Sequence, residues 1–243
     1  MQDRQHIVSA FDEELHRIES LILEMGGLVE TQIEDAAEAL VRRDVELGDS
    51  VRDRDRHVDT LNARIDEEVV RLLALRQPLA EDLRFAVSAL KIAAALERIG
   101  DYAKNIGKRN TIIARSEVLQ PASRSIRRMS ALARDMVHDV LDAYLRRDLP
   151  LAEEVRRRDQ EVDHMHNALF RELLTYMIED PRNITPCMHM LFVAKNVERI
   201  GDHATAIAEQ VAYMLTGEMP GADRPKADAT SFAAPGREDE KQG

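Results

Sequence analysis

The residues best suited to chemistry in this sequence are acids that recur in pairs, the second acid four residues after the first. The pairs are Asp55 with Asp59, Glu97 with Asp101, Asp159 with Asp163, and Glu198 with Asp202. A spacing of four residues places both carboxylates of a pair on one face of a helix. Each pair therefore presents two negative charges to whatever lies against that face.

Two of these pairs continue an apolar stripe that we expect a helix to turn towards the core of a bundle. Glu97 and Asp101 follow, at steps of three and four residues, the series Leu83, Val87, Leu90 and Ala94. Glu198 and Asp202 follow in the same way the series Ile184, Met188, Leu191 and Lys195. Such steps are typical of the buried face of a helix. The sequence therefore predicts carboxylates at contacts between helices.

Carboxylates turned towards the interior of a bundle need compensation, because they lose hydration and repel one another. They could be protonated, paired with Arg or Lys, or bound to cations, and oxygen ligands suit Mg, Mn, Fe or Ca. We expect a metal site in each half of the chain, since four acids in each half are too many to be protonated at neutral pH. Asn105 and His166, close in sequence to Asp101 and Asp163, are weaker candidate ligands.

Two alternatives to a metal site stay open from the sequence. The acids could lie at a solvent-exposed rim, where carboxylates are simply hydrated. Lys195 precedes Glu198 by three residues and could neutralise it without a metal. Gly100 and Gly201 favour the metal site, since each directly precedes an aspartate and lets a neighbouring helix or a bound ion come close.

The composition favours long helices and excludes several classes of protein. The chain has 243 residues, 44% of them apolar and only 4% aromatic, with few Gly and Pro, a balance typical of helical bundles. The formal net charge of −11 disfavours binding to nucleic acid. The single cysteine, Cys187, excludes an intramolecular disulfide and a cysteine-based metal cage. No apolar run approaches the ~20 residues of a membrane span, so we expect a cytoplasmic protein.

An internal repeat organises the chain. At an offset of 104 residues Asp55 falls on Asp159, and after a loop difference of three residues the offset becomes 101. The residues Glu-Arg-Ile-Gly-Asp at 97–101 then coincide with the same five residues at 198–202. We therefore predict an all-α protein made of two tandem copies of a three-helix bundle.

The boundaries of the predicted elements follow from the apolar periodicity and from the Pro and Gly residues between helices. Helices are expected over residues 9–46, 49–76, 80–113, 122–147, 150–179 and 184–215. We expect the first bundle over residues 1–118, the second over 119–216, and a disordered polar tail over 217–243. Each bundle then contains four of the paired acids.

The sequence resembles the PhoU family of phosphate-transport accessory and regulatory proteins over nearly the whole chain up to about residue 215. Two stretches are similar to the first helix of that family, Phe11-Asp12-Glu13-Glu14-Leu15 and Met25-Gly26-Gly27-Leu28-Val29-Glu30. The duplicated Glu-Arg-Ile-Gly-Asp segments are the most specific point of likeness. The family's metal pattern, a Glu or Asp followed four residues later by Asp, falls on all four acid pairs.

This resemblance implies tandem three-helix bundles without catalytic activity. It also implies clusters of divalent or trivalent cations on the bundle surface, with iron, manganese, zinc or magnesium as the candidates. Ala206 in place of an asparagine, and Lys195 on the stripe, depart from the family pattern in the second half.

The resemblance further implies a negative regulator of the phosphate-starvation response. Such an adaptor links the ATPase subunit of a phosphate ABC transporter to a sensor histidine kinase, and it reaches the membrane only through its partners. Whether the chain forms a homodimer stays open.

Two other functions compete with this interpretation. A carboxylate-bridged di-metal oxidase of ferritin-like type needs Glu-x-x-His pairs within one four-helix bundle. Such spacings occur as Glu13 with His16 and Glu161 with His164, but Glu161 lies across its helix from Asp159. The other competitor is a metal-free helical scaffold in which the acids only confer solubility.

Overall fold

The computed structural model describes residues 2–115 and 119–221, and every secondary-structure element within these ranges is a helix. The α-helices are α1 (Gln2–Arg42), α2 (Val45–Arg76), α3 (Glu81–Ile113), α4 (Gln120–Arg146), α5 (Leu149–Glu179) and α6 (Ile184–Thr216). A short 3₁₀ helix, η1 (Pro181–Asn183), joins the last two. The predicted all-α class is confirmed. None of the described helices combines the length and the hydropathy of a membrane-spanning segment.

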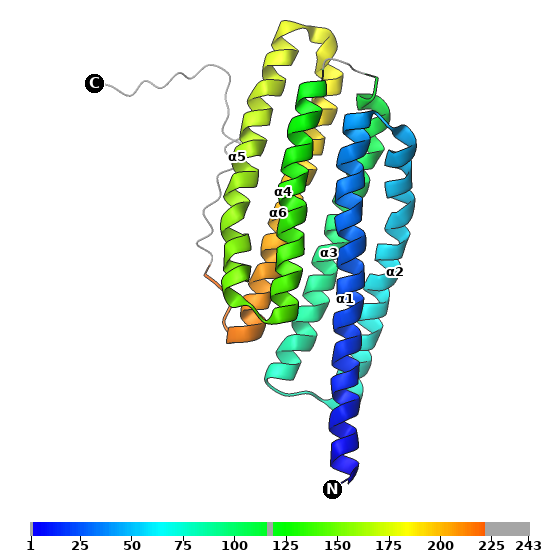
Figure 1. The fold of residues 1–243 in the computed structure, drawn as a ribbon, viewed down its shortest axis with the longest axis vertical. Coiled ribbons are helices and arrows are strands. Elements are labelled where there is room, and N and C mark those ends of the chain that lie inside the picture. The colour runs from blue at the N-terminus through cyan, green and yellow to red at the C-terminus, as the bar shows by residue number, and fades with distance from the viewer. Residues whose placement is uncertain (1, 116–118, 222–243) are drawn as a thin grey trace, which may run out of the picture.

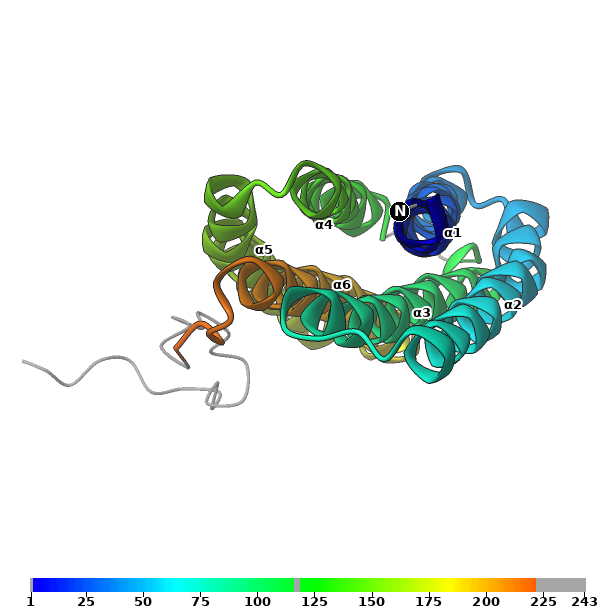
Figure 2. The same ribbon diagram turned by 90° about the horizontal axis from the view of Figure 1, so that it is seen from below.

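The helices form two up-and-down bundles, α1–α3 and α4–α6, that lie side by side (Figure 1). Seen along the long axis, α1 and α4 are neighbours on one side, and α3 and α6 are neighbours on the other (Figure 2). Helices α2 and α5 close the two ends of this arrangement. The two halves therefore contact each other through the pairs α3–α6 and α1–α4.

The two halves are related by an approximate two-fold axis that passes between Tyr102 and His203. These two residues are equivalent in the repeat, and the centroids of their rings lie 5.6 Å apart. The α1–α4 contact obeys the same symmetry, because the Arg134–Glu34 pair has the His138–Glu30 pair as its equivalent. The nitrogen–oxygen distances of these pairs are 3.1 Å and 3.3 Å. The chain thus packs its own repeats against each other as the subunits of a two-fold dimer would.

Equivalent aspartates begin the second helix of each half. The Asp44 carboxylate accepts a hydrogen bond from the backbone N–H of Leu47 at 2.9 Å, and Asp148 accepts one from Leu151 at 3.0 Å. The residue before each cap has a left-handed backbone, with φ of 58° and 57°. The predicted extension of the first helix to residue 46 is therefore wrong, since α1 ends at Arg42 and Asp44 caps α2.

The predicted core stripe of α3 and α6 is also wrong. Leu83 and Ile184 are 41% and 46% exposed, and the other predicted members are mostly half-buried or exposed: Val87, Leu90, Ala94, Met188, Leu191 and Lys195. The buried stripe of α3 lies beside it and consists of Ala86, Ala89, Ala93, Leu96, Gly100 and Ala103. Small side chains let α3 approach α2 and α6 closely, so the larger residues lie at the edge of the contact.

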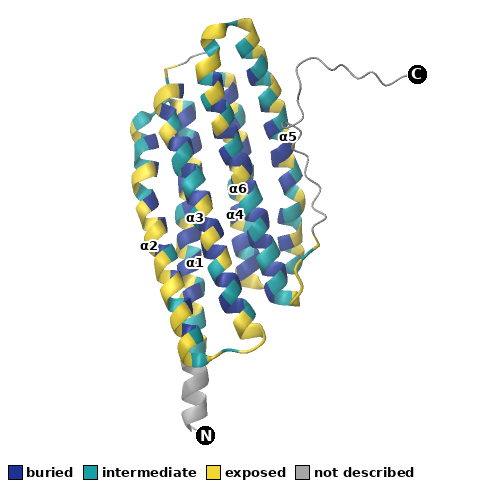
Figure 3. Ribbon diagram, turned by 180° about the vertical axis from the view of Figure 1, so that it is seen from behind, coloured by how far each residue is buried: buried dark blue, intermediate teal, exposed yellow. Residues whose placement is uncertain are grey.

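Burial runs as a stripe along every helix, with exposed residues covering the outer faces (Figure 3). The predicted division after residue 118 falls between α3 and α4. Of the predicted tail over 217–243, residues 222–243 lie outside the described ranges. The division and the tail stay predictions.

Candidate functional site

The contact between α2 and α3 gathers the four acids of the first half, here called the first acid cluster: Asp55, Asp59, Glu97 and Asp101. Asp55 is 4% exposed and faces α3, whereas Glu97 and Asp101 are half-buried and Asp59 is exposed. Burial raises the pKa of Glu97, and the negative charge of Asp101 raises it further against the opposing charge of Arg98. The negative charges of Asp59 and Asp55 also raise the pKa of Glu97. These carboxylates therefore lie close enough to repel one another.

Lys104, which the sequence analysis did not select, compensates part of this charge. Its ammonium donates hydrogen bonds to Asp55 Oδ2 on α2 and to Asp101 Oδ1 on its own helix. Burial opposes the charge of Lys104, yet these two hydrogen bonds raise the pKa of the ammonium. Burial also raises the pKa of Asp55, because this carboxylate loses more hydration than one ammonium replaces.

Gly100 makes room for this arrangement. A Cβ at position 100 would lie 3.3 Å from Asp55 Oδ1 and 3.2 Å from Gln32 Oε1 of α1. The predicted close approach of a neighbouring helix at this glycine is confirmed. Gln32 is 1% exposed, and neither atom of its amide has a hydrogen-bond partner within the described part of the chain. A buried amide from α1 therefore faces the same point as the Asp55 carboxylate.

The equivalent acids of the second half, here called the second acid cluster, are Asp159 and Asp163 on α5 and Glu198 and Asp202 on α6. The first three are buried and Asp202 is half-buried. Gly201 repeats the role of Gly100, since a Cβ there would lie 3.0 Å from Asp159 Oδ1. Lys195 Nζ lies 2.9 Å from Glu198 Oε1. The alternative in which this lysine neutralises Glu198 is therefore the arrangement observed.

The two clusters differ in how a lysine enters them. Lys104 joins two helices, but its equivalent in the second half is the buried Thr205. Lys195 contacts Glu198 on its own helix, and its equivalent in the first half is Ala94. Each half thus uses one lysine, taken from a different position of the repeat.

The weaker candidates differ in burial. His166 is buried on α5, on the stripe that carries Asp159 and Asp163. Asn105 is half-buried on α3, directly after Lys104. Both lie on helices that carry an acid cluster.

The spacings that a ferritin-like oxidase would use do not meet inside a bundle. Glu13, His16, Glu161 and His164 are all exposed. His16 Nδ1 instead lies 3.1 Å from Glu19 Oε2 on its own helix. These pairs therefore lie on the surface, away from the acid clusters.

Across residues 2–115 and 119–221, no three acidic, histidine or cysteine side chains converge as ligands of one metal ion. In the first acid cluster the Lys104 ammonium lies between Asp55 and Asp101, in the position of a bridging cation. The donors themselves are carboxylate oxygens with a buried amide beside them, which is the chemistry of a hard-cation site. The first acid cluster therefore fits a metal by the chemistry of its donors.

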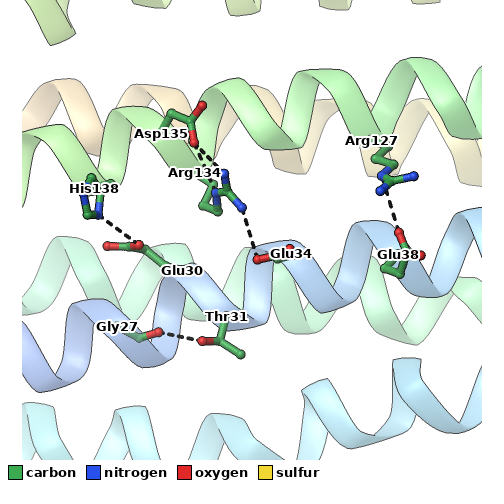
Figure 4. A network of polar contacts seen from close by, with 9 residues as sticks. All are labelled: Gly27, Glu30, Thr31, Glu34, Glu38, Arg127, Arg134, Asp135 and His138. Atoms are coloured by element: carbon green, nitrogen blue, oxygen red, sulfur yellow. Dashed lines mark hydrogen bonds and ion pairs between the residues drawn. The ribbon is translucent and has the colours of Figure 1, made fainter.

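A separate polar network, which the sequence analysis missed, connects α1 and α4 (Figure 4). Arg127 contacts Glu38 at 3.4 Å, and the symmetric Arg134–Glu34 and His138–Glu30 pairs continue the row. A cavity of about 320 Å³ opens along this row between the two helices. The contact between α1 and α4 therefore carries a row of exposed charges beside apolar packing such as that of Gly26 against Leu141.

Duplicated three-helix bundles with an acid cluster in each define a class of tandem-repeat helical proteins. The PhoU domain model matches this chain twice, over residues 22–109 and 126–211. The chain therefore belongs to the PhoU family.

Relatives of known name cover nearly the whole chain. A phosphate-specific transport system accessory protein PhoU homolog from Caulobacter vibrioides (strain NA1000 / CB15N) is 51% identical over 227 residues, covering 93% of this chain and 99% of the relative. A protein of the same name from Rhizobium meliloti is 48% identical over 226 residues, covering 93% of this chain and 95% of the relative. The crystal structure of PhoU from Pseudomonas aeruginosa is similar with a TM-score of 0.82 and 40% identity, covering 86% of this chain and 100% of that one.

Proposed function

We propose that this chain is a non-enzymatic accessory protein of a phosphate-specific transport system. The observation that supports this most strongly is its likeness, over both repeats and nearly its full length, to proteins with that name. Phosphate uptake is the process that such a protein would control. Its partners are then the phosphate ABC transporter, through the ATPase subunit, and a phosphate-sensing histidine kinase.

We propose that the chain is a negative regulator. In this proposal the chain represses the phosphate-starvation response while phosphate is plentiful and restrains uptake through the transporter. The exposed outer faces of long, rigid helices suit an adaptor that contacts two partners at once. It works in the cytoplasm and reaches the membrane through these partners.

We further propose that both acid clusters hold metal cations. Asp55, Asp59, Glu97 and Asp101 would supply the first site, with Asn105 beside them. Asp159, Asp163, Glu198 and Asp202 would supply the second, with His166. A bound divalent or trivalent ion (iron, manganese, zinc or magnesium) would supply the positive charge that one lysine in each half provides only in part.

A gene deletion in the host organism tests the regulatory role. Alkaline phosphatase is measured in cells grown at high phosphate, with and without the gene for this chain. The proposal predicts high alkaline phosphatase in the deletion strain and normal repression after the gene is restored. Unchanged repression in the deletion strain would contradict it.

The metal-free scaffold is a second candidate, because Lys104 and Lys195 already pair with acids in the two clusters. Metal analysis of protein purified without chelators separates the two ideas. The metal proposal predicts that the wild-type protein contains bound metal. Asp55→Asn, Glu97→Gln or Asp101→Asn should each lower the amount of metal bound per chain. A metal-free wild-type protein that still represses alkaline phosphatase would favour the scaffold.

A further inference from the structure

We propose that Lys104 is a built-in competitor for cations at the first acid cluster, so that a metal ion binds there only when this side chain withdraws. The inference rests on the proposed metal site and adds the residue that sets its affinity. A metal ion there would be held by the carboxylates of Asp55 and Asp101, and the Lys104 ammonium already donates to Asp55 Oδ2 and Asp101 Oδ1. Both cannot occupy that position together.

The geometry supports a competitor in place of a fixed structural ion pair. Lys104 reaches Asp55 across the α2–α3 contact and Asp101 one turn back on α3. The lysine side chain is 21% exposed, whereas the Asp55 side chain is 5% exposed. A lysine has a flexible four-carbon stem, so its ammonium can move to solvent while the buried carboxylate stays in place.

Gln32 is the second observation that points to a cation. Its amide is buried, has no hydrogen-bond partner within the described residues, and faces the point that Asp55 Oδ1 also faces beside Gly100. Buried polar groups are normally satisfied, and an amide oxygen is a good ligand for a hard cation. With Lys104 in place, the arrangement leaves this group unused.

The repeat gives the inference an internal comparison. Thr205, the equivalent of Lys104, carries no charge, so the second half has no lysine at this position. Removal of the Lys104 charge should therefore change metal binding at the first acid cluster and leave the second cluster as it is.

Manganese binding to the full chain tests this directly. Calorimetric titrations with Mn²⁺ compare the wild-type chain with Lys104→Met and with Lys104→Gln, all in an Asp159→Asn/Asp202→Asn background that silences the second cluster. The expected result is at least tenfold tighter Mn²⁺ binding for both Lys104 variants. The matched control is Lys108→Met, one turn further along α3 at an exposed position, which should bind like the wild-type chain.

Thermal unfolding gives a readout that does not depend on biological activity. In EDTA, Lys104→Met should lower Tm because Asp55 and Asp101 lose their cation, and Mn²⁺ should raise the Tm of this variant more than that of the wild-type chain. The inference would be overturned if the wild-type chain binds Mn²⁺ and both folded Lys104 variants bind it equally well or more weakly. The proposed metal site would then still stand. Absence of Mn²⁺ binding in every variant would overturn both.

Discussion

Gly201 lies so close to Asp159 that a Cβ on the glycine would come within 3.0 Å of the Asp159 carboxylate oxygen Oδ1. Gly100 has the same relationship to Asp55 in the other half, at 3.3 Å. A glycine inside a helix costs about 1 kcal/mol relative to alanine. In both halves the missing side chain of the glycine lets a buried carboxylate of one helix lie against the backbone of the neighbouring helix.

The first prediction concerns this close approach. Gly201→Val should lower the free energy of unfolding by about 1–3 kcal/mol, because its Cβ would lie only 3.0 Å from Asp159 Oδ1 and its methyl groups need further space beside Val162. Urea denaturation measures the change. Gly27→Val is the matched control, since a Cβ at that helical position would meet nothing within 4 Å apart from its chain neighbours and the backbone of its own helix, and it should not destabilise the protein. A Gly201→Val variant as stable as the control would contradict the packing described.

The second prediction concerns pH. Burial and the charge of Asp101 raise the pKa of Glu97 above its ordinary value of 4.5. The folded state therefore holds this proton more tightly than the unfolded state, and stability falls as pH rises from about 4.5 through the folded pKa. Glu97→Gln removes that loss, so it should raise Tm at pH 7 in EDTA and have little effect at pH 4.

The control for the pH series is Glu67→Gln, which changes an exposed acid on α2. Its effect on Tm should be small at both pH values. A lower Tm of Glu97→Gln at pH 7 in EDTA would show that the charged carboxylate is stabilising, contrary to the account of the first acid cluster.

The third prediction concerns Lys195. Lys195→Met removes the ammonium 2.9 Å from the buried Glu198 carboxylate, and hydrogen bonds to charged groups contribute about 1.5–3 kcal/mol. Urea denaturation should show a loss of that order. The double change Lys195→Met/Glu198→Gln should recover part of it, since the buried charge is then absent. Additive losses in the double variant would mean that the two side chains do not act as a pair.

The fourth prediction concerns the row of charges between α1 and α4. Glu34→Gln breaks the exposed pair with Arg134, and such pairs contribute about 0–1 kcal/mol. The resulting loss in the free energy of unfolding should be measurable in dilute buffer. It should vanish in 1 M salt, where the screening length is about 3 Å. A loss that persists at high salt would indicate that the row has a packing role beyond its charges.

The repeat and the six long helices of the described residues could be predicted from the sequence. Repeated five-residue identity and helical periodicity are local properties of the chain. Asp44 and Asp148 are equivalent residues of the repeat, but their role as caps depends on where the backbone turns. For that reason the predicted end of the first helix lies four residues beyond the observed one.

The contacts that balance the acids could not be predicted in the same way. Lys104 carried a local signal, since it follows Asp101 by three residues, but its reach to Asp55 depends on how closely Gly100 brings α2 and α3 together. Gln32 comes from α1, and no spacing within the sequence connects it to the first acid cluster. The core stripe of α3 was misplaced because two adjacent stripes satisfy the same steps, and the one with smaller residues is buried.

Anomalous diffraction from crystals of the full chain grown with manganese would show whether metal binds at the acid clusters. We expect anomalous peaks at both acid clusters, with the Lys104 ammonium displaced from Asp55 and Asp101. Diffraction without a peak at either cluster, and with Lys104 still between these two carboxylates, would contradict this expectation.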